Sequence, residues 1–186
     1  MGVTGMLLSI AFCLPQATAL EHSPTRLPEL REIDAVEILE HVRRARARAV
    51  LVNVWATWCA PCRKEIPDLL RLRDELQDQG LQLVLVSADF PSDVDAVRTF
   101  LAGYGVDFTT YLRVGDDTEF VEWLERRWSG GLPASFVYDD RGRLRHFWEG
   151  TAGYEQFRKK VLDVIGTVPG PSGPPLEPPA TTTENP

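Results

Sequence analysis

Apolar and polar positions follow two different periods along the central part of the chain, and they predict strands that alternate with helices. Two short apolar runs rich in β-branched residues, Val50–Trp55 and Leu81–Ser87, predict buried strands. A shorter strand is expected at Phe108–Leu112. Ala134–Tyr138 and Leu144–Trp148 flank an Asp-Asp-Arg-Gly turn, which indicates an antiparallel hairpin.

Apolar residues spaced three and four apart predict helices between and after these strands. The predicted helices are Asp34–Arg48, Ala60–Gln79, Asp93–Tyr104, Thr118–Trp128 and Tyr154–Ile165. Asp34 and Ser92 are expected to cap the first and third of them. The fourth has an aromatic face that we expect in the core, made of Phe120, Trp123, Leu124 and Trp128. Strands alternating with helices, followed by a hairpin and a last helix, predict an α/β sandwich with a mixed sheet.

The two ends of the chain differ in composition from the part between them. Residues 1–20 contain an apolar stretch followed by Ala17-Thr18-Ala19, which is typical of a secretory signal peptide and its cleavage site. An uncleaved membrane anchor is the alternative. Residues 169–186 are rich in Pro, Gly and Thr, and we expect a disordered tail there. This leaves one domain at residues 21–168, in a periplasmic or other extracytoplasmic location.

The overall charge is acidic. A net charge of −7 argues against nucleic acid or an anionic membrane as the main partner. One local exception is the basic cluster of Arg43, Arg44, Arg46 and Arg48. We interpret it from the sequence as a solvated helix end, where positive side chains suit the helix dipole.

Cys59 and Cys62 carry the chemistry that the sequence suggests. They stand three residues apart at the start of a predicted helix, so both thiols share one face and lie close enough to form a disulfide. Free backbone N–H groups at a helix N-terminus stabilise a thiolate, and the pKa of such a thiol falls from about 8.5 to roughly 3.5–7.5. Removal of the leader takes Cys13 with it, which leaves a single redox pair rather than a disulfide scaffold.

A zinc site is the first alternative for a Cys-x-x-Cys motif. It needs further ligands, and the sequence has no second cysteine pair. The histidines stand far apart with no ligand spacing, at His22, His41 and His146. We therefore expect no metal and no cofactor beyond the redox-active disulfide itself.

Three motifs together resemble the thioredoxin superfamily, most closely its exported TlpA/ResA-like branch. The first is Val50–Cys62 with its Trp-Cys-Ala-Pro-Cys ending, the second is Pro67 in the helix that follows, and the third is Gly131–Phe136 with Pro133. The resemblance covers about residues 31–165. It implies a three-layer sandwich around a mixed central sheet, with an extra helix and strand inserted between Pro91 and Leu112.

The resemblance also implies a mechanism of dithiol–disulfide exchange. Cys59 attacks the disulfide of a partner, and Cys62 resolves the mixed disulfide. Trp58 and Pro61 flank the cysteines. A cis bond between Leu132 and Pro133 is implied beside the sulfurs, where the backbone pairs with the substrate chain. An ordinary trans proline is the alternative.

Proton transfer to and from the pair requires a different group from the one that thioredoxin uses. Asn53 occupies the position of the buried Asp of thioredoxin and cannot exchange protons. By alignment Asp89 falls where many relatives carry a Glu, so it is a candidate acceptor for the Cys62 proton. A turn-capping role for Asp89 is the alternative.

The expected activity is that of a protein-disulfide reductase. No His or Lys stands between the cysteines, so the thiolate is less stabilised and the couple less oxidising. The expected partners are disulfide-containing exported proteins, among them apoproteins in cytochrome c maturation, and a membrane thiol–disulfide electron donor. We expect a monomer that binds no nucleic acid. The alternatives are a disulfide-forming oxidase and a non-catalytic binding or chaperone module. A peroxiredoxin-type peroxidase is disfavoured, because it uses a cysteine outside this tight motif.

Overall fold

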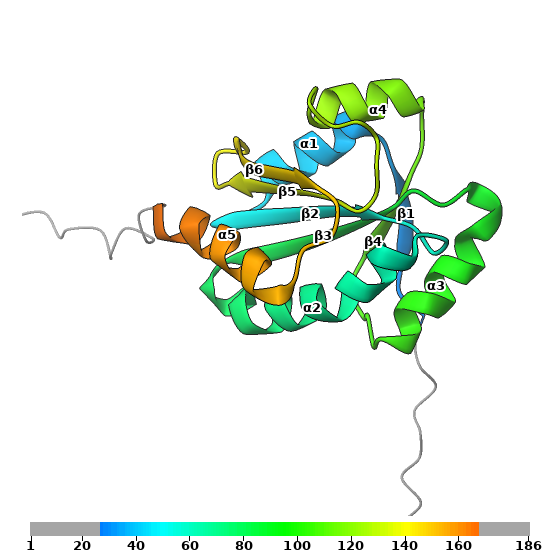
Figure 1. Cartoon of the computed structure of the whole chain (residues 1–186), viewed down its shortest axis with the longest axis horizontal. Helices are drawn as coiled ribbons and strands as arrows, with labels where there is room; N and C mark the ends of the chain where they lie inside the picture. Colours follow the sequence, from blue (N-terminus) through cyan, green and yellow to red (C-terminus); the bar gives the residue numbers. More distant parts are fainter. Residues whose placement is uncertain (1–26, 168–186) are drawn as a thin grey trace, which may run out of the picture.

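A six-stranded mixed sheet runs through the middle of the domain, in the order β1-β4-β3-β2-β5-β6 (Figure 1). The structure, a computed structural model, describes residues 27–167. The strands are β1 (Leu30–Ile33), β2 (Ala49–Trp55), β3 (Leu81–Ser87), β4 (Thr110–Arg113), β5 (Ala134–Asp139) and β6 (Leu144–Glu149). The first four strands are mutually parallel, whereas β5 and β6 pair antiparallel to their neighbours. The predicted mixed sheet and the antiparallel hairpin before the last helix are therefore confirmed.

Helices cover both faces of the sheet and complete a three-layer α/β sandwich. They are α1 (Ala35–Arg44), α2 (Ala60–Leu76), α3 (Val94–Gly103), α4 (Asp117–Leu124) and α5 (Tyr154–Thr167). Short 3₁₀ turns follow α2 at Gln77–Gln79 and precede α3 at Pro91–Asp93. Helices α1 and α4 pack on one face, while α2 and α5 pack together on the other (Figure 1). The predicted architecture is confirmed.

The central strand β2 explains why the sheet needs cover on both sides. All seven of its residues are buried, as expected of a strand with parallel and antiparallel neighbours and helices on both faces. Its alternate residues separate into two cores. Leu51 and Trp55 belong to the core under α2, α3 and α5, and Val52 and Val54 belong to the core under α1 and α4.

The predicted insertion is present as α3 and β4. Strand β4 lies between β1 and β3, so the inserted strand widens the sheet in its interior rather than at an edge. Its observed range, Thr110–Arg113, begins later than the predicted Phe108–Leu112. Helix α3 contributes Val97 and Leu101 to the core that it shares with α2.

Several element boundaries differ from the prediction. Strand β1 was not predicted, because four residues with only Ile33 buried give too short a pattern. Helix α1 ends at Arg44 instead of Arg48, since Ala45 turns to extended backbone. Residues 1–20 and 169–186, for which a leader and a tail are predicted, lie outside the described residues. No helix in the described part of the chain is long and apolar enough to span a membrane.

The predicted aromatic face of the fourth helix is partly wrong. Helix α4 ends at Leu124, because Glu125 adopts extended backbone, and Trp123 is 58% exposed. Trp128 lies beyond the helix but is buried. Its ring packs edge-on against Phe120 and Phe136, and its Nε1 donates a hydrogen bond to the Gly131 carbonyl at 2.8 Å.

The two predicted helix caps have different outcomes. Asp34 caps α1 with a complete capping box, in which it accepts the Glu37 N–H at 2.8 Å and Glu37 accepts the Asp34 N–H at 2.9 Å. The prediction for Ser92 is wrong, because Pro91 starts a 3₁₀ turn and the helix begins later. Its hydroxyl bonds to the Asp93 carboxylate instead.

Asp34 and Ser92 therefore provide a matched test of the cap assignment. We expect Asp34→Ala to lower the free energy of unfolding by about 1 kcal/mol, because the Glu37 N–H in the first turn loses its side-chain acceptor. Ser92→Ala is expected to change it by less than about 0.5 kcal/mol. Urea denaturation followed by circular dichroism measures both, and equal effects of the two substitutions would contradict the assignment of the cap.

Candidate active site: a cysteine pair at the start of α2

Cys59 and Cys62 form a disulfide where the chain passes from β2 into α2. Cys59 is the N-cap residue of the helix, and its Sγ accepts the backbone N–H of Cys62 at 3.3 Å. The Cα atoms are 5.3 Å apart, within the normal range for a disulfide. The same N–H and the positive end of the helix dipole are available to a Cys59 thiolate once the bond is reduced. The sequence prediction of a redox pair on one helix face is thus matched by the geometry.

The two sulfurs differ in access to solvent. Cys59 is 6% exposed and Cys62 is 1% exposed, so an incoming disulfide reaches Cys59 first. Trp58, directly before the pair, is 63% exposed, and Pro61 lies exposed in the first turn of α2. This asymmetry fits an attacking Cys59 and a resolving Cys62.

The Leu132–Pro133 peptide bond is cis. The register that pairs Val54 with Ala134 places both residues beside the end of β2, where the chain turns toward the cysteines. Leu132 contacts both hydrophobic cores, and the Pro133 carbonyl accepts the Gly150 N–H at 2.8 Å. The Leu132–Pro133 segment is therefore fixed by packing at Leu132 and by a backbone hydrogen bond at Pro133.

A cavity of about 560 Å³ opens between this segment and α4. Trp58, Phe90 and Leu132 form its wall nearest the cysteines, and Arg126 lies on the α4 side. Trp58 and Phe90 are the most exposed large apolar side chains of the described residues, at 63% and 66%. The site thus offers an apolar surface next to Cys59 that a substrate chain can cover.

Asp89 lies two residues after the end of β3 and is 1% exposed. Its carboxylate accepts the Thr57 backbone N–H at 2.9 Å and the hydroxyls of Thr57 and Ser87. These bonds hold the loop that leads from β2 to Cys59. They match the turn-holding alternative from the sequence, and the catalytic role of Asp89 stays a prediction.

Glu65 is a carboxylate that sequence reasoning missed. It lies three residues after Cys62 on the buried face of α2 and is 3% exposed. Its Oε1 accepts the Ala152 N–H, while Oε2 is buried and has no hydrogen-bond partner in the described part of the chain. Helical spacing from Cys62 was the available signal, because positions three apart share a face.

Burial raises the pKa of Glu65 to about 7, and the nearby Asp68 charge adds to the rise. The Ala152 N–H and the Asn53 side chain oppose it by favouring the carboxylate. Asn53 is itself fixed by a 3.0 Å hydrogen bond from its Nδ2 to Ser135 Oγ. Glu65 can therefore gain or lose a proton near neutral pH inside the core next to Cys62.

Within residues 27–167 no group of three or more His, Cys, Asp or Glu side chains is arranged to hold a metal ion. His41 lies far along the chain from the cysteines, bonded to Gln82 at 2.9 Å.

Known proteins resemble this chain in sequence and fold. Thiol-disulfide oxidoreductase ResA from Bacillus thuringiensis (strain Al Hakam) is 30% identical over 99 residues, which are 53% of this chain and 53% of that protein. ResA from Bacillus subtilis (strain 168) is 30% identical over 106 residues, or 57% and 55% of the two chains. The chain thus spans about half the length of these relatives.

A thiol:disulfide interchange protein of the thioredoxin family from Chlorobium tepidum TLS has a similar crystal structure. The TM-score is 0.56 at 24% identity, over 68% of this chain and 84% of that one, which supports a thioredoxin-like fold. The sequence pattern of the AhpC/TSA family matches residues 32–147. With this match over more than half its length, and with the fold and cysteine pair described above, the chain belongs to the AhpC/TSA family.

Proposed function

We propose that this protein is a thiol–disulfide oxidoreductase that reduces disulfides in exported proteins. The observation that carries the proposal is the position of the Cys59–Cys62 pair, with the attacking sulfur at a helix N-terminus and the second sulfur buried behind it. The relatives named as thiol-disulfide oxidoreductases support it. The leader predicted at residues 1–20 supports an extracytoplasmic location.

The reaction has two steps. The Cys59 thiolate attacks one sulfur of the substrate disulfide, forming a mixed disulfide and releasing the other substrate sulfur as a thiolate, which takes up a proton. Cys62 then loses its proton and attacks Cys59 Sγ, which releases the second substrate thiol. Two electrons have passed to the substrate, and the protein is left with the disulfide seen in this structure.

We assign the proton of Cys62 to Glu65 rather than to Asp89. The Glu65 carboxylate has an unpartnered buried oxygen one helical turn from Cys62 and a pKa of about 7. The Asp89 oxygens already accept hydrogen bonds from Thr57 and Ser87. A general base with a pKa near the working pH is best suited to this transfer.

Disulfide exchange also requires a source of electrons for the Cys59–Cys62 pair and a class of substrate disulfides. The oxidised pair needs two electrons from outside the domain, for which we propose a membrane thiol–disulfide donor. Among exported proteins, apoproteins of c-type cytochromes are a narrower candidate class. Trp58, Pro61, Leu132 and Pro133 are proposed to contact the substrate chain beside Cys59.

Trapping tests the two cysteine roles. With a model disulfide protein as substrate, we expect Cys62→Ala to accumulate a mixed disulfide that dithiothreitol releases, because the second step has lost its nucleophile. Cys59→Ala is the matched control and is expected to form no adduct. Non-reducing gels and mass spectrometry of the Cys59 peptide give the readout. A binding module without catalytic activity would leave both variants free of adduct.

The direction of transfer is tested by the reduction potential of the pair. We expect a value well below about −120 mV, the range of strong oxidants, since no charged residue between the cysteines stabilises the thiolate. Equilibration with glutathione buffers, followed by alkylation of free thiols, measures it. A potential near −120 mV would instead favour the disulfide-forming oxidase.

Single-turnover kinetics show whether Glu65 or Asp89 accepts the proton of Cys62. We expect Glu65→Gln to slow resolution of the mixed disulfide at neutral pH by at least about tenfold, because a general base has been removed. The rate should also lose its rise with pH near 7. Asp89→Asn is the comparison, and we expect its resolution rate to keep that pH dependence. The opposite pattern would assign the proton to Asp89.

The pKa of Glu65 also predicts how stability depends on pH. Its folded pKa, about 7, lies above the ordinary value of 4.5, so the folded state holds the proton more strongly than the unfolded state. Relative to Glu65→Gln, the wild type should lose stability as the pH rises from about 5 to 8 and show no further relative loss above that. Urea denaturation of both oxidised proteins across this range tests it. Parallel stability curves would show that Glu65 does not titrate there.

A further inference from the structure

Two groups of arginines that are distant in the sequence meet at one end of the domain. The first lies in the last turn of α1 and the residues just after it, and the second lies in and after the β5–β6 turn. A Cβ added to Gly142 in that turn would lie 2.7 Å from Arg43 Cγ, so the turn packs directly against the end of α1. We call this surface the arginine pole, and its residues are Arg43, Arg44, Arg46, Arg48, Arg141, Arg143 and Arg145.

The arginine pole has an excess of positive charge in an otherwise acidic protein. Residues 40–48 and 139–145 contain seven arginines and three carboxylates, whereas the whole chain has a net charge of −7. The sequence shows only the cluster at the end of α1, which by itself is interpreted as a solvated helix end. The structure adds the arginines of the hairpin to it.

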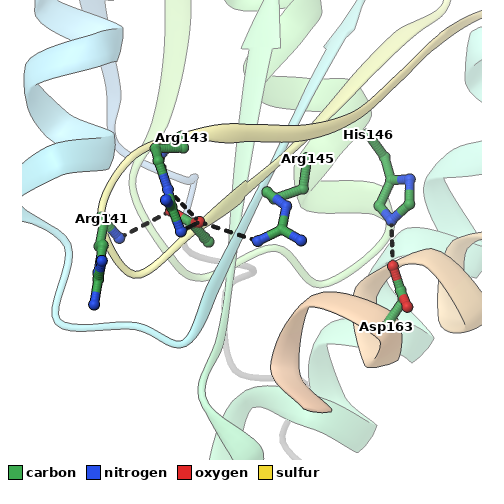
Figure 2. Close-up of polar contacts among 6 residues, drawn as sticks. Arg141, Arg143, Arg145, His146 and Asp163 are labelled. Carbon is green, nitrogen blue, oxygen red and sulfur yellow. Dashed lines mark hydrogen bonds and ion pairs between the residues drawn. The ribbon is translucent and has the colours of Figure 1, made fainter. Parts of the chain in front are cut away.

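Only part of this charge is neutralised within the pole. Asp139 is 1% exposed and accepts hydrogen bonds from Arg143 Nε at 2.9 Å, Arg145 Nη1 at 3.4 Å and the Arg141 backbone at 3.0 Å (Figure 2). Burial by itself raises the pKa of Asp139, but these donors outweigh it and lower the pKa, so the carboxylate stays ionised. It holds two guanidiniums in place with one negative charge.

Several guanidiniums remain available. Arg44 pairs with Glu40 at 2.8 Å. Arg43, Arg46 and Arg141 are exposed, and their guanidiniums have no ion-pair partner in the part of the chain that the structure describes. Their charge is therefore open to an outside anion.

The arginine pole lies at the far end of the sheet from the cysteine pair. Strand β2 begins at Ala49, which pairs with Asp139 beside the pole, and ends at Trp55 shortly before Cys59. Seven residues of strand span roughly 20 Å. A partner bound at the pole therefore leaves Cys59 uncovered.

We propose that the arginine pole binds the headgroups of anionic phospholipids. Guanidinium groups match phosphate oxygens with two parallel hydrogen bonds, and several exposed arginines on one surface can each take a different headgroup. In this orientation the cysteine pair faces away from the bilayer and is open to soluble exported substrates, whereas reduction by the proposed membrane donor takes place on molecules released from the lipid surface. The inference does not depend on the proposed function.

The same surface is less suited to other anionic partners. Protein interfaces depend on buried apolar or aromatic contacts, and the exposed large apolar residues of the described chain all lie elsewhere. They are Leu27, Val36, Trp58, Phe90, Tyr104 and Trp123. Single-stranded nucleic acids need aromatic side chains for base stacking, and none is exposed at the pole.

Vesicle sedimentation of the full chain tests this proposal. We expect binding to vesicles of phosphatidylglycerol and phosphatidylcholine, weaker binding to phosphatidylcholine alone, and loss of the difference in high salt. Arg46→Gln with Arg141→Gln should weaken binding to the anionic vesicles by about tenfold. Residues 1–20 are the same in the wild type and in the variants, so they contribute equally to each comparison between them.

The matched control removes the same charge elsewhere. Lys64→Gln with Arg126→Gln, both exposed and remote from the pole, should change vesicle binding by less than about threefold. Disulfide exchange by the Arg46 and Arg141 double variant should equal that of the wild type. Equal losses in the two double variants, or equal binding to both vesicle types, would overturn the proposal. So would tighter binding to a single-stranded oligonucleotide than to the anionic vesicles.

Discussion

The hydrogen bond from the Cys62 N–H to Cys59 Sγ depends on where β2 ends and α2 begins, and the proposed disulfide exchange depends on that bond. A fully buried strand cannot easily shift, so it delivers Cys59 to the N-cap position with little freedom. Asp89 then fixes the loop between them through Thr57. The reactive sulfur is thus placed by the core rather than by flexible surface groups.

Two buried carboxylates lie near the pair, and their surroundings give them different properties. Asp89 accepts hydrogen bonds on both carboxylate oxygens, which suits a structural role. Glu65 has one partnered oxygen and one unpartnered oxygen, which suits a group that exchanges a proton. Asn53 on β2 donates a hydrogen bond to Ser135 on β5, and its side chain also favours the Glu65 carboxylate. Strands β2 and β5 therefore help to position the proposed proton acceptor. Carboxylate type alone does not decide such roles; the number of donors around each does.

Local patterns in the sequence were enough to predict the cysteine pair, most of the strands and the sandwich. Their signals lie in adjacent residues: β-branched runs, helical spacing and turn residues. What the sequence did not show depends on contacts between distant segments. Glu65 is a charged residue, which is usually exposed, but it lies on the buried face of α2. Trp123 is predicted in the core, but α4 ends at Leu124 and Trp123 is exposed. The arginine pole needs the β5–β6 turn to pack on α1, which no local pattern records.

The most direct test of the account is the pH dependence of alkylation at Cys59 in the reduced Cys62→Ala variant. Mass spectrometry of the Cys59 peptide separates this reaction from that of Cys13. If the helix N-terminus stabilises the thiolate, half-maximal reactivity should occur at a pH well below about 8.5, the value of an ordinary cysteine. Half-maximal reactivity at or above about 8.5 would contradict the claim that the start of α2 activates Cys59.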